Sequence, residues 1–188
     1  MIVPLRPGEA EYWCAFARHH ETPERWHQYS WRRSTFYKSL VEYIAEVLVI
    51  LEQRDHHRTF APYYFQIEPN LRLQPPGERA VDWHSDAYYG HQPEEWNVWI
   101  PLMHLSDDSQ RLWVDDTPAG PHPIDVPFGS AYLFPGAQWR HGNQINATDV
   151  TRVSMDFRLI SARDFKDSGL ASVKYGVKLS LGEYWRAP

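Results

Sequence analysis

The stretch that decides the fold reads Val81-Asp82-Trp83-His84-Ser85-Asp86-Ala87-Tyr88-Tyr89-Gly90-His91. Its first residues predict a strand over 80–86. Alternate side chains of a strand share a face, so we expect His84 and Asp86 to point the same way. One imidazole and one carboxylate would then meet at a single point, as in a metal site. A pair with this spacing also arises by chance in a chain with 10 His and 24 acidic residues, so its significance rests on the strand context.

The chain on either side of this stretch alternates apolar and polar residues. Beyond Pro62 the period is two, and Pro, Gly, Asn and Asp punctuate it. Eight or nine strands with no helix between them predict a mainly β protein, and the double-sheet jelly roll, cupin-like in shape, suits this number. The predicted strands are 63–68, 71–74, 80–86, 95–102, 111–115, 122–126, 130–134, 139–145 and 150–160.

The segment before Pro62 has a different period. Between residues 34 and 53, apolar side chains recur every three or four positions, which predicts a helix packed on the outside of the sheet. Shorter helices are predicted over 8–18 and from Thr22-Pro23-Glu24, where threonine would cap the helix and proline would occupy its first turn. The apolar set of the longest helix comprises Phe36, Tyr37, Leu40, Val41, Ile44, Val47, Leu48 and Leu51.

Length and composition favour a single domain. The 188 residues can bury a sizeable core, and we expect one domain over 1–188. Within it, residues 1–60 would form a helical support, 61–160 the jelly-roll core and 161–188 an extension. Tyr175, Tyr184 and Trp185 predict that this extension docks on the core.

Charge and cysteine content limit the partners. A formal charge of −5 and a pI near 6.0 argue against a nucleic-acid surface. The most apolar segment, 40–51, contains Glu42 and Glu46 and is too short to cross a bilayer. One cysteine cannot form an internal disulfide, and the first ten residues lack a charged region followed by an apolar one. We therefore expect a cytoplasmic protein with a small-molecule substrate and no membrane partner, while its oligomeric state is left open.

Three histidines downstream are candidates for a third ligand: His104, His122 and His141. His141 is favoured because it follows an apolar strand and the turn Pro135-Gly136. With His84 and Asp86 it would complete a 2-His-1-carboxylate triad, which leaves three positions of an Fe(II) ion open.

The strand predicted over 150–160 has two distinct faces. Val153, Met155, Phe157 and Leu159 share the apolar face, whereas Arg152, Ser154, Asp156 and Arg158 share the polar face. The simplest interpretation sends the polar face to solvent. In a jelly roll, however, this face can line the interior, where Arg152 would match a carboxylate with its guanidinium fork and Ser154 would add a hydrogen bond.

These motifs carry a resemblance. His84-x-Asp86, His141 and Arg152-x-Ser154 resemble the Fe(II)/2-oxoglutarate-dependent dioxygenase superfamily, whose fold is a double-stranded β-helix. Tyr89-Gly90-His91 and Asn97-x-Trp99-Ile100-Pro101-Leu102 resemble a narrower group, the bacterial hydroxylases of streptomycin-type aminoglycoside biosynthesis and Kdo hydroxylation. The likeness covers roughly residues 62–160. Met103 departs from the group, in which a threonine often follows the Pro-Leu pair.

The resemblance implies a role for each matched residue. His84, Asp86 and His141 would bind Fe(II), and Arg152 with Ser154 would anchor the far carboxylate of 2-oxoglutarate, with O2 as the third reactant.

Further residues have alternative interpretations. Asn97 would contact 2-oxoglutarate or the metal ligands, or would only bond to the backbone. Tyr89 and His91 are candidates for substrate contact, with solvent exposure the alternative for His91. Arg158 would bind an anionic substrate or pair with Asp156 or a neighbouring strand, and structural pairing is the simpler expectation.

The function implied is hydroxylation of an unactivated C–H bond of a small polar metabolite in natural-product or sugar biosynthesis. A metal-dependent cupin without 2-oxoglutarate is one alternative, although such sites usually present His-x-His where this chain has His84-x-Asp86. A non-catalytic carbohydrate-binding jelly roll that uses its tryptophans is another. The sequence leaves the substrate open, as well as the choice between hydroxylation, desaturation and cyclisation.

Overall fold

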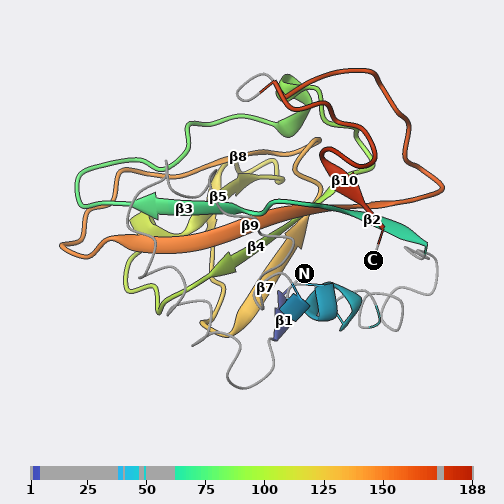
Figure 1. Cartoon of the computed structure of the whole chain (residues 1–188). Helices are drawn as coiled ribbons and strands as arrows, with labels where there is room; N and C mark the ends of the chain where they lie inside the picture. Colours follow the sequence, from blue (N-terminus) through green and yellow to red (C-terminus); the bar gives the residue numbers. More distant parts are fainter. Residues whose placement is uncertain are drawn as a thin grey trace.

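The computed structural model describes residues 2–4, 38–39, 41–46, 49, 62–172 and 176–187. The short helices predicted over 8–18 and from Thr22 lie outside these residues, as does Tyr175. Two antiparallel sheets make up the described fold, which confirms the predicted mainly β jelly roll (Figure 1). The strands are β1 (Ile2–Pro4), β2 (Tyr63–Gln66), β3 (Asn70–Gln74), β4 (Trp96–Pro101), β5 (Leu112–Asp115), β6 (His122–Ile124), β7 (Ser130–Phe134), β8 (Arg140–Gly142), β9 (Arg152–Ser161) and β10 (Trp185–Arg186), with 3-10 turns η2 (Asp86–Tyr89) and η3 (Asp108–Gln110).

The larger sheet has the order β1-β7-β4-β9-β2-β10, and the smaller sheet the order β6-β5-β8. An apolar cluster joins them, with Trp99 and Phe134 from the larger sheet against Leu112 and Val114 from the smaller. Burying these side chains between two sheets removes apolar surface from water, which is the main favourable contribution to folding. The interior between the sheets is therefore the place where a ligand site can form.

Strand β9 organises the larger sheet (Figure 1). One edge pairs with β4, and the other pairs first with β3 and then with β2. Asn97 lies opposite Arg158 in one ladder, and Gln74 lies opposite Arg152 in the other. Side chains directly opposite each other on one face are neighbours, so this register decides which groups reach the two arginines.

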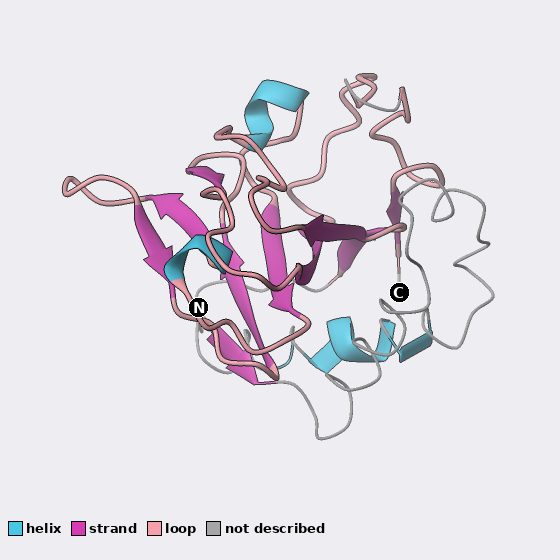
Figure 2. Ribbon diagram, turned by 90° about the vertical axis from the view of Figure 1, so that its left-hand side faces the viewer, coloured by secondary structure: helices cyan, strands magenta, loops and turns pink. Residues whose placement is uncertain are grey.

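Both faces of β9 are covered. On the apolar face, Phe157 meets Tyr43 edge-to-face, with ring centroids 6.5 Å apart. Tyr43 belongs to helical residues 41–46, which lie outside the strands (Figure 2) and agree with the predicted helix over 34–53 where it is described. On the polar face, Arg152 and Arg158 are buried as well. Of the two interpretations of this face, the one that sends it to solvent is therefore wrong, and its side chains line the interior.

The strand predicted over 80–86 is wrong. Only His84 makes a β-bridge there, to His141, and Asp86 already begins η2. Ser85 between them is extended (φ −112°, ψ 150°), so the local geometry that brings His84 and Asp86 together survives in two residues. Gly90 ends η2 at φ 90°, a left-handed conformation that suits glycine. The other predicted strands are present with somewhat different ends.

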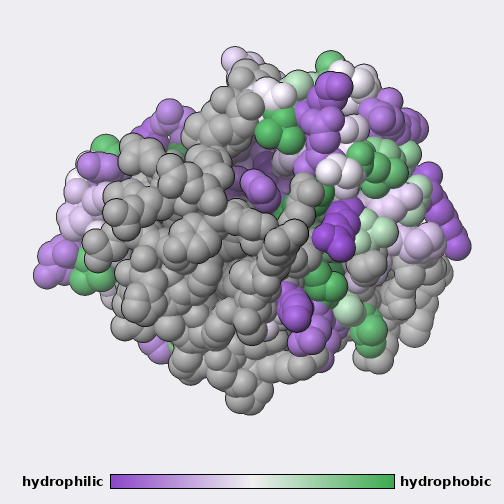
Figure 3. Space-filling model, viewed as in Figure 1, coloured by the Kyte–Doolittle hydropathy of each residue, from purple (hydrophilic) through white to green (hydrophobic). Residues whose placement is uncertain are grey.

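The C-terminal segment docks on the core. β10 pairs with β2, and Trp185 is completely buried. Among the described residues no helix has the length and apolar character needed to cross a membrane. On the described part of the face in Figure 3, hydrophilic and hydrophobic residues are interspersed.

Candidate metal centre and anion pocket

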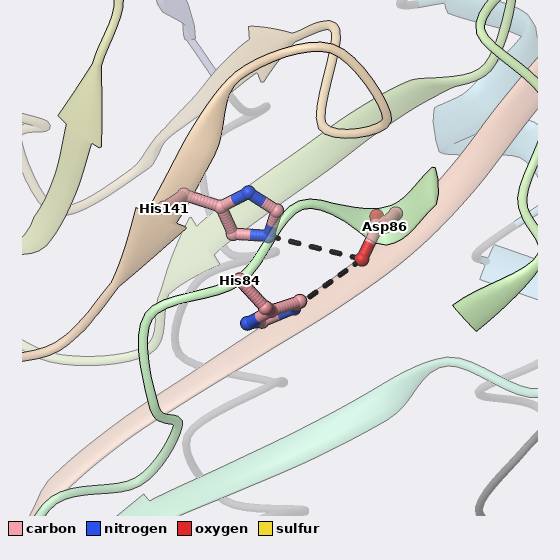
Figure 4. Close-up of side chains that lie close together, drawn as sticks. All are labelled: His84, Asp86 and His141. Atoms are coloured by element: carbon pink, nitrogen blue, oxygen red, sulfur yellow. Dashed lines mark ion pairs between the residues drawn. The ribbon is translucent and has the colours of Figure 1, made fainter. Parts of the chain in front are cut away.

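Three side chains converge between the sheets: His84, Asp86 and His141. Each offers a ligand atom, and these atoms all lie within 4.8 Å of one another. Figure 4 shows both imidazoles directed at one carboxylate oxygen. Asp86 Oδ1 is 3.4 Å from His84 Nε2 and 3.8 Å from His141 Nε2. Ligands about 2.1 Å from a metal and at right angles to each other would lie about 3.0 Å apart, so these separations are only slightly wider than a bound ion requires.

The backbone fixes the two histidines as a pair. His84 N–H donates to His141 O at 3.0 Å and His141 N–H donates to His84 O at 2.8 Å. This bridge places the ring centroids 4.5 Å apart. Gly142 follows His141, and a Cβ there would lie 3.1 Å from the Trp83 Cα, so glycine permits the close approach of the two segments.

Each histidine has its ring orientation fixed by a carbonyl. Nδ1 of His84 lies 2.7 Å from Asp82 O, and Nδ1 of His141 lies 3.0 Å from Trp139 O. A carbonyl oxygen only accepts, so Nδ1 carries the proton and Nε2 presents its lone pair to the centre. Burial lowers the pKa of His141 to about 4, against a smaller opposite effect from Asp86. His141 is therefore neutral at pH 7, as a metal ligand must be.

Asp86 is fully buried and ionised. Its Oδ2 accepts hydrogen bonds from Asn97 Nδ2 at 2.7 Å and from Arg158 Nε at 2.9 Å. Burial alone would raise the pKa of Asp86, but the charge and the hydrogen bond of Arg158 hold it well below its usual value. The carboxylate is therefore ionised at pH 7.

These residues fit a divalent metal ion. Asp86 Oδ1 is buried without a hydrogen bond of good geometry, although Arg158 Nη2 lies 2.9 Å away. An unsatisfied buried carboxylate oxygen beside two imidazole lone pairs is unfavourable unless a cation lies among them. Two nitrogens and one oxygen with open positions are the donor set typical of non-haem Fe(II) sites.

A second unsatisfied group lies in the same cavity. Arg152 has no exposed surface; its Nε donates to Gln74 Oε1 at 2.9 Å and its Nη1 donates to Ser154 Oγ, but Nη2 has no partner among the described residues. Its guanidinium lies over the Trp99 ring, 5.9 Å from the centroid. Burial, with Arg72 nearby, lowers the pKa of Arg152 to about 9, so the side chain is still charged at pH 7.

Two of the three arginines around the cavity form ion pairs with carboxylates of the described chain, and Arg152 does not. Arg72 binds Asp156 with Nε 2.8 Å from Oδ1, and Arg158 binds Asp86. His84, His141, Asn97 and the three arginines line the same cavity. Of the arginines lining it, Arg152 alone has no carboxylate partner among the described residues. An anion that enters the cavity would meet this guanidinium.

Two of the predicted substrate contacts lie to one side. Tyr89 packs its ring 5.2 Å from that of His84, and His91 is buried with Nδ1 2.7 Å from Glu95 Oε2. Neither is among the residues lining the cavity. Of the two alternatives for His91, solvent exposure is wrong, because Glu95 and the ring of Tyr184 cover it.

Arg158 forms an ion pair within the protein, which was the simpler expectation, but its partner is Asp86 and not Asp156. Pairing with Asp156 is wrong: β3 brings Arg72 and Asn70 to Asp156, and both donate to its carboxylate. Arg158 turns to Asp86 instead. Asn97 donates to the same carboxylate from the opposite strand.

Other residues that build the site were missed. Gln74 holds Arg152, Tyr184 holds Arg158 from the C-terminal segment, and Gly136 leaves room for Asn97. A Cβ at Gly136 would lie 2.4 Å from the Asn97 amide nitrogen, and Gly136 O accepts from Asp86 N–H at 2.9 Å. Strand alternation places Gln74 on the inward face of β3, but no local pattern identifies Tyr184 or Gly136.

Proteins of known structure share this fold. No family model matches the chain, but its fold is that of the non-haem iron, 2-oxoglutarate-type oxygenases. The nickel complex of the non-haem monooxygenase ThoJ superposes with a TM-score of 0.65 at 18% identity, over 90% of this chain and 76% of that one. The epimerase SnoN in complex with Fe3+, alpha ketoglutarate and nogalamycin RO gives a TM-score of 0.62 at 16% identity, over 98% and 92%.

A relative in sequence is more specific. The streptomycin biosynthesis protein StrG of Streptomyces griseus is 37% identical over 123 residues, which cover 65% of this chain and 59% of StrG. The match thus spans about three fifths of that protein. The predicted resemblance to proteins of streptomycin-type biosynthesis is confirmed.

Proposed function

We propose that this protein is an Fe(II)/2-oxoglutarate-dependent oxygenase that hydroxylates an unactivated C–H bond of a small polar metabolite in a biosynthetic pathway. One observation carries the proposal: a single cavity brings the His84, Asp86 and His141 cluster together with a buried arginine that lacks an anion. The cluster lacks a cation and the Arg152 guanidinium lacks an anion, and a metal ion with a bound dicarboxylate would supply both.

Each residue has a distinct task. His84, Asp86 and His141 hold Fe(II), and Arg152 receives the far carboxylate of 2-oxoglutarate through its free Nη2. Ser154 and Gln74 hold the guanidinium in place by accepting its other hydrogen bonds. Fe(II) with 2-oxoglutarate and O2 supplies the oxidant that removes hydrogen from the substrate. The protein supplies orientation and a cavity from which water is excluded.

The charge balance of the cavity supports 2-oxoglutarate. A buried guanidinium without an anion costs several kcal/mol, and a bound carboxylate offsets that cost with charge-assisted hydrogen bonds. A metal-dependent cupin that does not use 2-oxoglutarate leaves Arg152 without a task. The resemblance to StrG and to the SnoN complex, which contains iron and alpha ketoglutarate, points the same way.

A carbohydrate-binding jelly roll agrees less well with the tryptophans. The candidate stacking residues are Trp96, Trp99, Trp113 and Trp139. Trp99 is only 3% exposed and packs in the core between the sheets and against Arg152, and Trp139 packs on the same apolar cluster. Trp96 and Trp113 are partly buried and lie on strands of different sheets, β4 and β5.

Anaerobic binding followed by turnover tests the proposal. We expect the purified protein to bind one Fe(II), and to bind 2-oxoglutarate much more tightly when the metal is present, because chelation adds to the contact with Arg152. Aerobic assays would then measure succinate release against a panel of polar metabolites, with His141→Ala as the matched control. Binding of 2-oxoglutarate that is equally tight without metal, or in His141→Ala, would overturn the proposal.

A product analysis separates hydroxylation from the other outcomes of the same chemistry. Mass spectrometry of the product under 18O2 should show one added oxygen atom that carries the label. A product of unchanged mass, as an epimerase gives, would keep the cofactor assignment and overturn the hydroxylase assignment.

A further inference from the structure

The two carboxylate oxygens of Asp86 lie in different surroundings. Oδ2 accepts two hydrogen bonds, from Asn97 Nδ2 at 2.7 Å and Arg158 Nε at 2.9 Å. Oδ1 faces the imidazoles of His84 and His141; Arg158 Nη2 lies 2.9 Å from it, but it accepts no hydrogen bond of good geometry among the described residues. Two hydrogen bonds thus hold Oδ2, while Oδ1 has none and is the oxygen that faces the centre.

This difference matters for the number of open metal positions. A carboxylate binds a cation through one oxygen or through both. With one oxygen, two histidines and an aspartate leave three positions open on a six-coordinate ion, which are needed for a two-point chelate and a third ligand. With both oxygens, Asp86 would occupy one of those three positions itself.

Two donors on neighbouring strands hold Oδ2. Asn97 on β4 lies directly opposite Arg158 on β9, and both reach the same oxygen. A carboxylate oxygen that already accepts two strong hydrogen bonds, one of them from a cation, is a poor ligand for a metal on its other side.

Arg158 is itself held on every side. Nη1 donates to Tyr184 Oη at 2.7 Å and to Gln66 Oε1 at 3.3 Å, while Nη2 lies 2.9 Å from Asp86 Oδ1. No nitrogen of this guanidinium is left for an anionic substrate. Its contacts are those of a residue that fixes another side chain.

We propose that Arg158 and Asn97 are positioning residues that restrict Asp86 to coordination through one oxygen and thereby keep a third metal position open. The inference rests on the proposed function, because it assumes a metal bound at the triad. It assigns to Arg158 a task other than the substrate contact or simple salt bridge that the sequence suggested.

Counting the exchangeable waters on bound Mn(II) tests the proposal directly, because the paramagnetic relaxation of water protons depends on that number. The wild-type protein should retain one exchangeable water after saturation with 2-oxoglutarate. Arg158→Gln removes the charge and the fork and leaves Asn97 as the one remaining donor to Oδ2, so the carboxylate can turn Oδ2 toward the metal and that last water should be lost. Metal affinity should also change, by roughly 10- to 100-fold, as is usual for partners of metal ligands.

We call the two hydrogen bonds of Asn97 and Arg158 to Asp86 Oδ2 the clamp. A matched control separates the effect of losing the clamp from the general effect of losing a buried arginine. Arg72→Gln breaks the ion pair with Asp156 on the same sheet and removes no hydrogen bond of Asp86, so it should retain the wild-type water number. Arg158→Lys keeps the charge but not the fork, and we expect an intermediate value. If Arg158→Gln does not fold, Asn97→Ala removes the other Oδ2 donor and should lower the number in the same direction.

Each result has one meaning. A wild-type water number in Arg158→Gln, or in Asn97→Ala when the former cannot be purified, would overturn the clamp while leaving the metal site intact. A wild-type protein that binds no Mn(II), or from which 2-oxoglutarate displaces no water, would overturn the proposed function itself.

Discussion

The two ends of strand β9 present the same side chain to the same interior and give it opposite surroundings. At one end, Arg152 is buried with only neutral hydrogen-bond partners and an unpaired Nη2. At the other end, Arg158 has a carboxylate, a phenol and an amide around it. Both guanidinium groups are buried, and only the second has an anion within the protein.

The difference indicates how a buried cation reveals its task. A charge that the protein pairs internally contributes to the fold or orients its partner, because its interactions are complete before any ligand arrives. A charge left without a counterion keeps an unfavourable desolvation cost in the free protein, and a ligand that brings the anion removes it. This contrast supports the proposals that Arg152 binds the anion and that Arg158 positions Asp86.

Removing Asp86 would break this comparison most severely, since it takes from Arg158 its hydrogen-bonded carboxylate and leaves, among the described residues, only the more distant Glu95, with Oε2 4.0 Å from Nε. Asp86→Ala should abolish measurable turnover and weaken metal binding by more than the roughly 10–100-fold that loss of an outer partner costs. It should also lower the free energy of unfolding of the metal-free protein by about 3–5 kcal/mol, because a buried charge loses its hydrogen-bonded partner. Calorimetric metal titration and urea unfolding would measure both effects.

A double variant separates the two effects of that substitution. Adding Arg158→Met to Asp86→Ala removes the orphaned charge, so stability should be largely regained while metal binding stays lost. If Asp86→Ala still supports turnover, the carboxylate is not a ligand, and if the double variant is no more stable, the ion pair is not what holds this end of β9.

Arg152→Met tests the other end and should give the next largest effect. It removes a charged contact worth about 1.5–3 kcal/mol, so the dissociation constant of 2-oxoglutarate should rise roughly 10- to 100-fold, with 1.4 kcal/mol for each factor of ten. Metal affinity should change little, because Arg152 does not contact the triad. Isothermal titration of 2-oxoglutarate into the Ni(II) form would measure this, with Arg72→Gln as the control for losing a cation from the same cavity. Equal weakening in both variants would contradict a specific anchor.

The sequence identified these two arginines and assigned them different expectations, an anion for Arg152 and structural pairing for Arg158, but it did not identify the partner of Arg158. Alternation along β9 placed Arg152 and Arg158 on one face, and the Pro-Gly turn with the following strand singled out His141, because both signals are local. The partner of Arg158 depends on which strand lies opposite. Asn97 is opposite Arg158 only in the folded register, and Arg72 takes Asp156 because β3 pairs with that part of β9.

The error over residues 80–86 has the same origin. A strand was expected there because the residues alternate, but the segment bonds to β8 and its end at only two places, through the bridge of His84 to His141 and the hydrogen bond from Asn143 N–H to Val81 O. The side chains of His84 and Asp86 still point to the same place, as expected of a strand, because the β-bridge orients His84 and the 3-10 turn orients Asp86. Tyr184, which reaches Arg158 from the C-terminal segment, follows from no periodicity at all, since a single tyrosine hydroxyl leaves no pattern in the chain.

The internally paired charges predict a pH dependence of stability that Arg152 does not share. Burial alone would raise the pKa of Asp156, but the charge and hydrogen bonds of Arg72 hold it below its ordinary value. The ionised carboxylate therefore stabilises the fold above the unfolded pKa of about 3.9, and this contribution is lost as the pH falls through the lower folded pKa. Asp156→Asn should lower the free energy of unfolding at pH 7 by about 1–2 kcal/mol. Urea unfolding at decreasing pH should show the gap to wild type narrowing below pH 4, and a gap that widens there would contradict this ion pair.

Tyr184→Phe should change the free energy of unfolding least of these substitutions. It also tests whether the two ends of β9 act independently. Burial raises the pKa of Tyr184, so the neutral phenol accepts a hydrogen bond from Arg158 at pH 7. Removing the hydroxyl leaves Arg158 still held by Asp86 and Gln66, so unfolding should become easier by only about 1 kcal/mol. The affinity for 2-oxoglutarate should stay at its wild-type value, because Arg152 has its own partners, Gln74 and Ser154. In the double variant with Arg152→Met the two losses of stability should therefore add to within about 0.5 kcal/mol. A clear departure from additivity would mean that the anion pocket and the clamp on Asp86 form one coupled network.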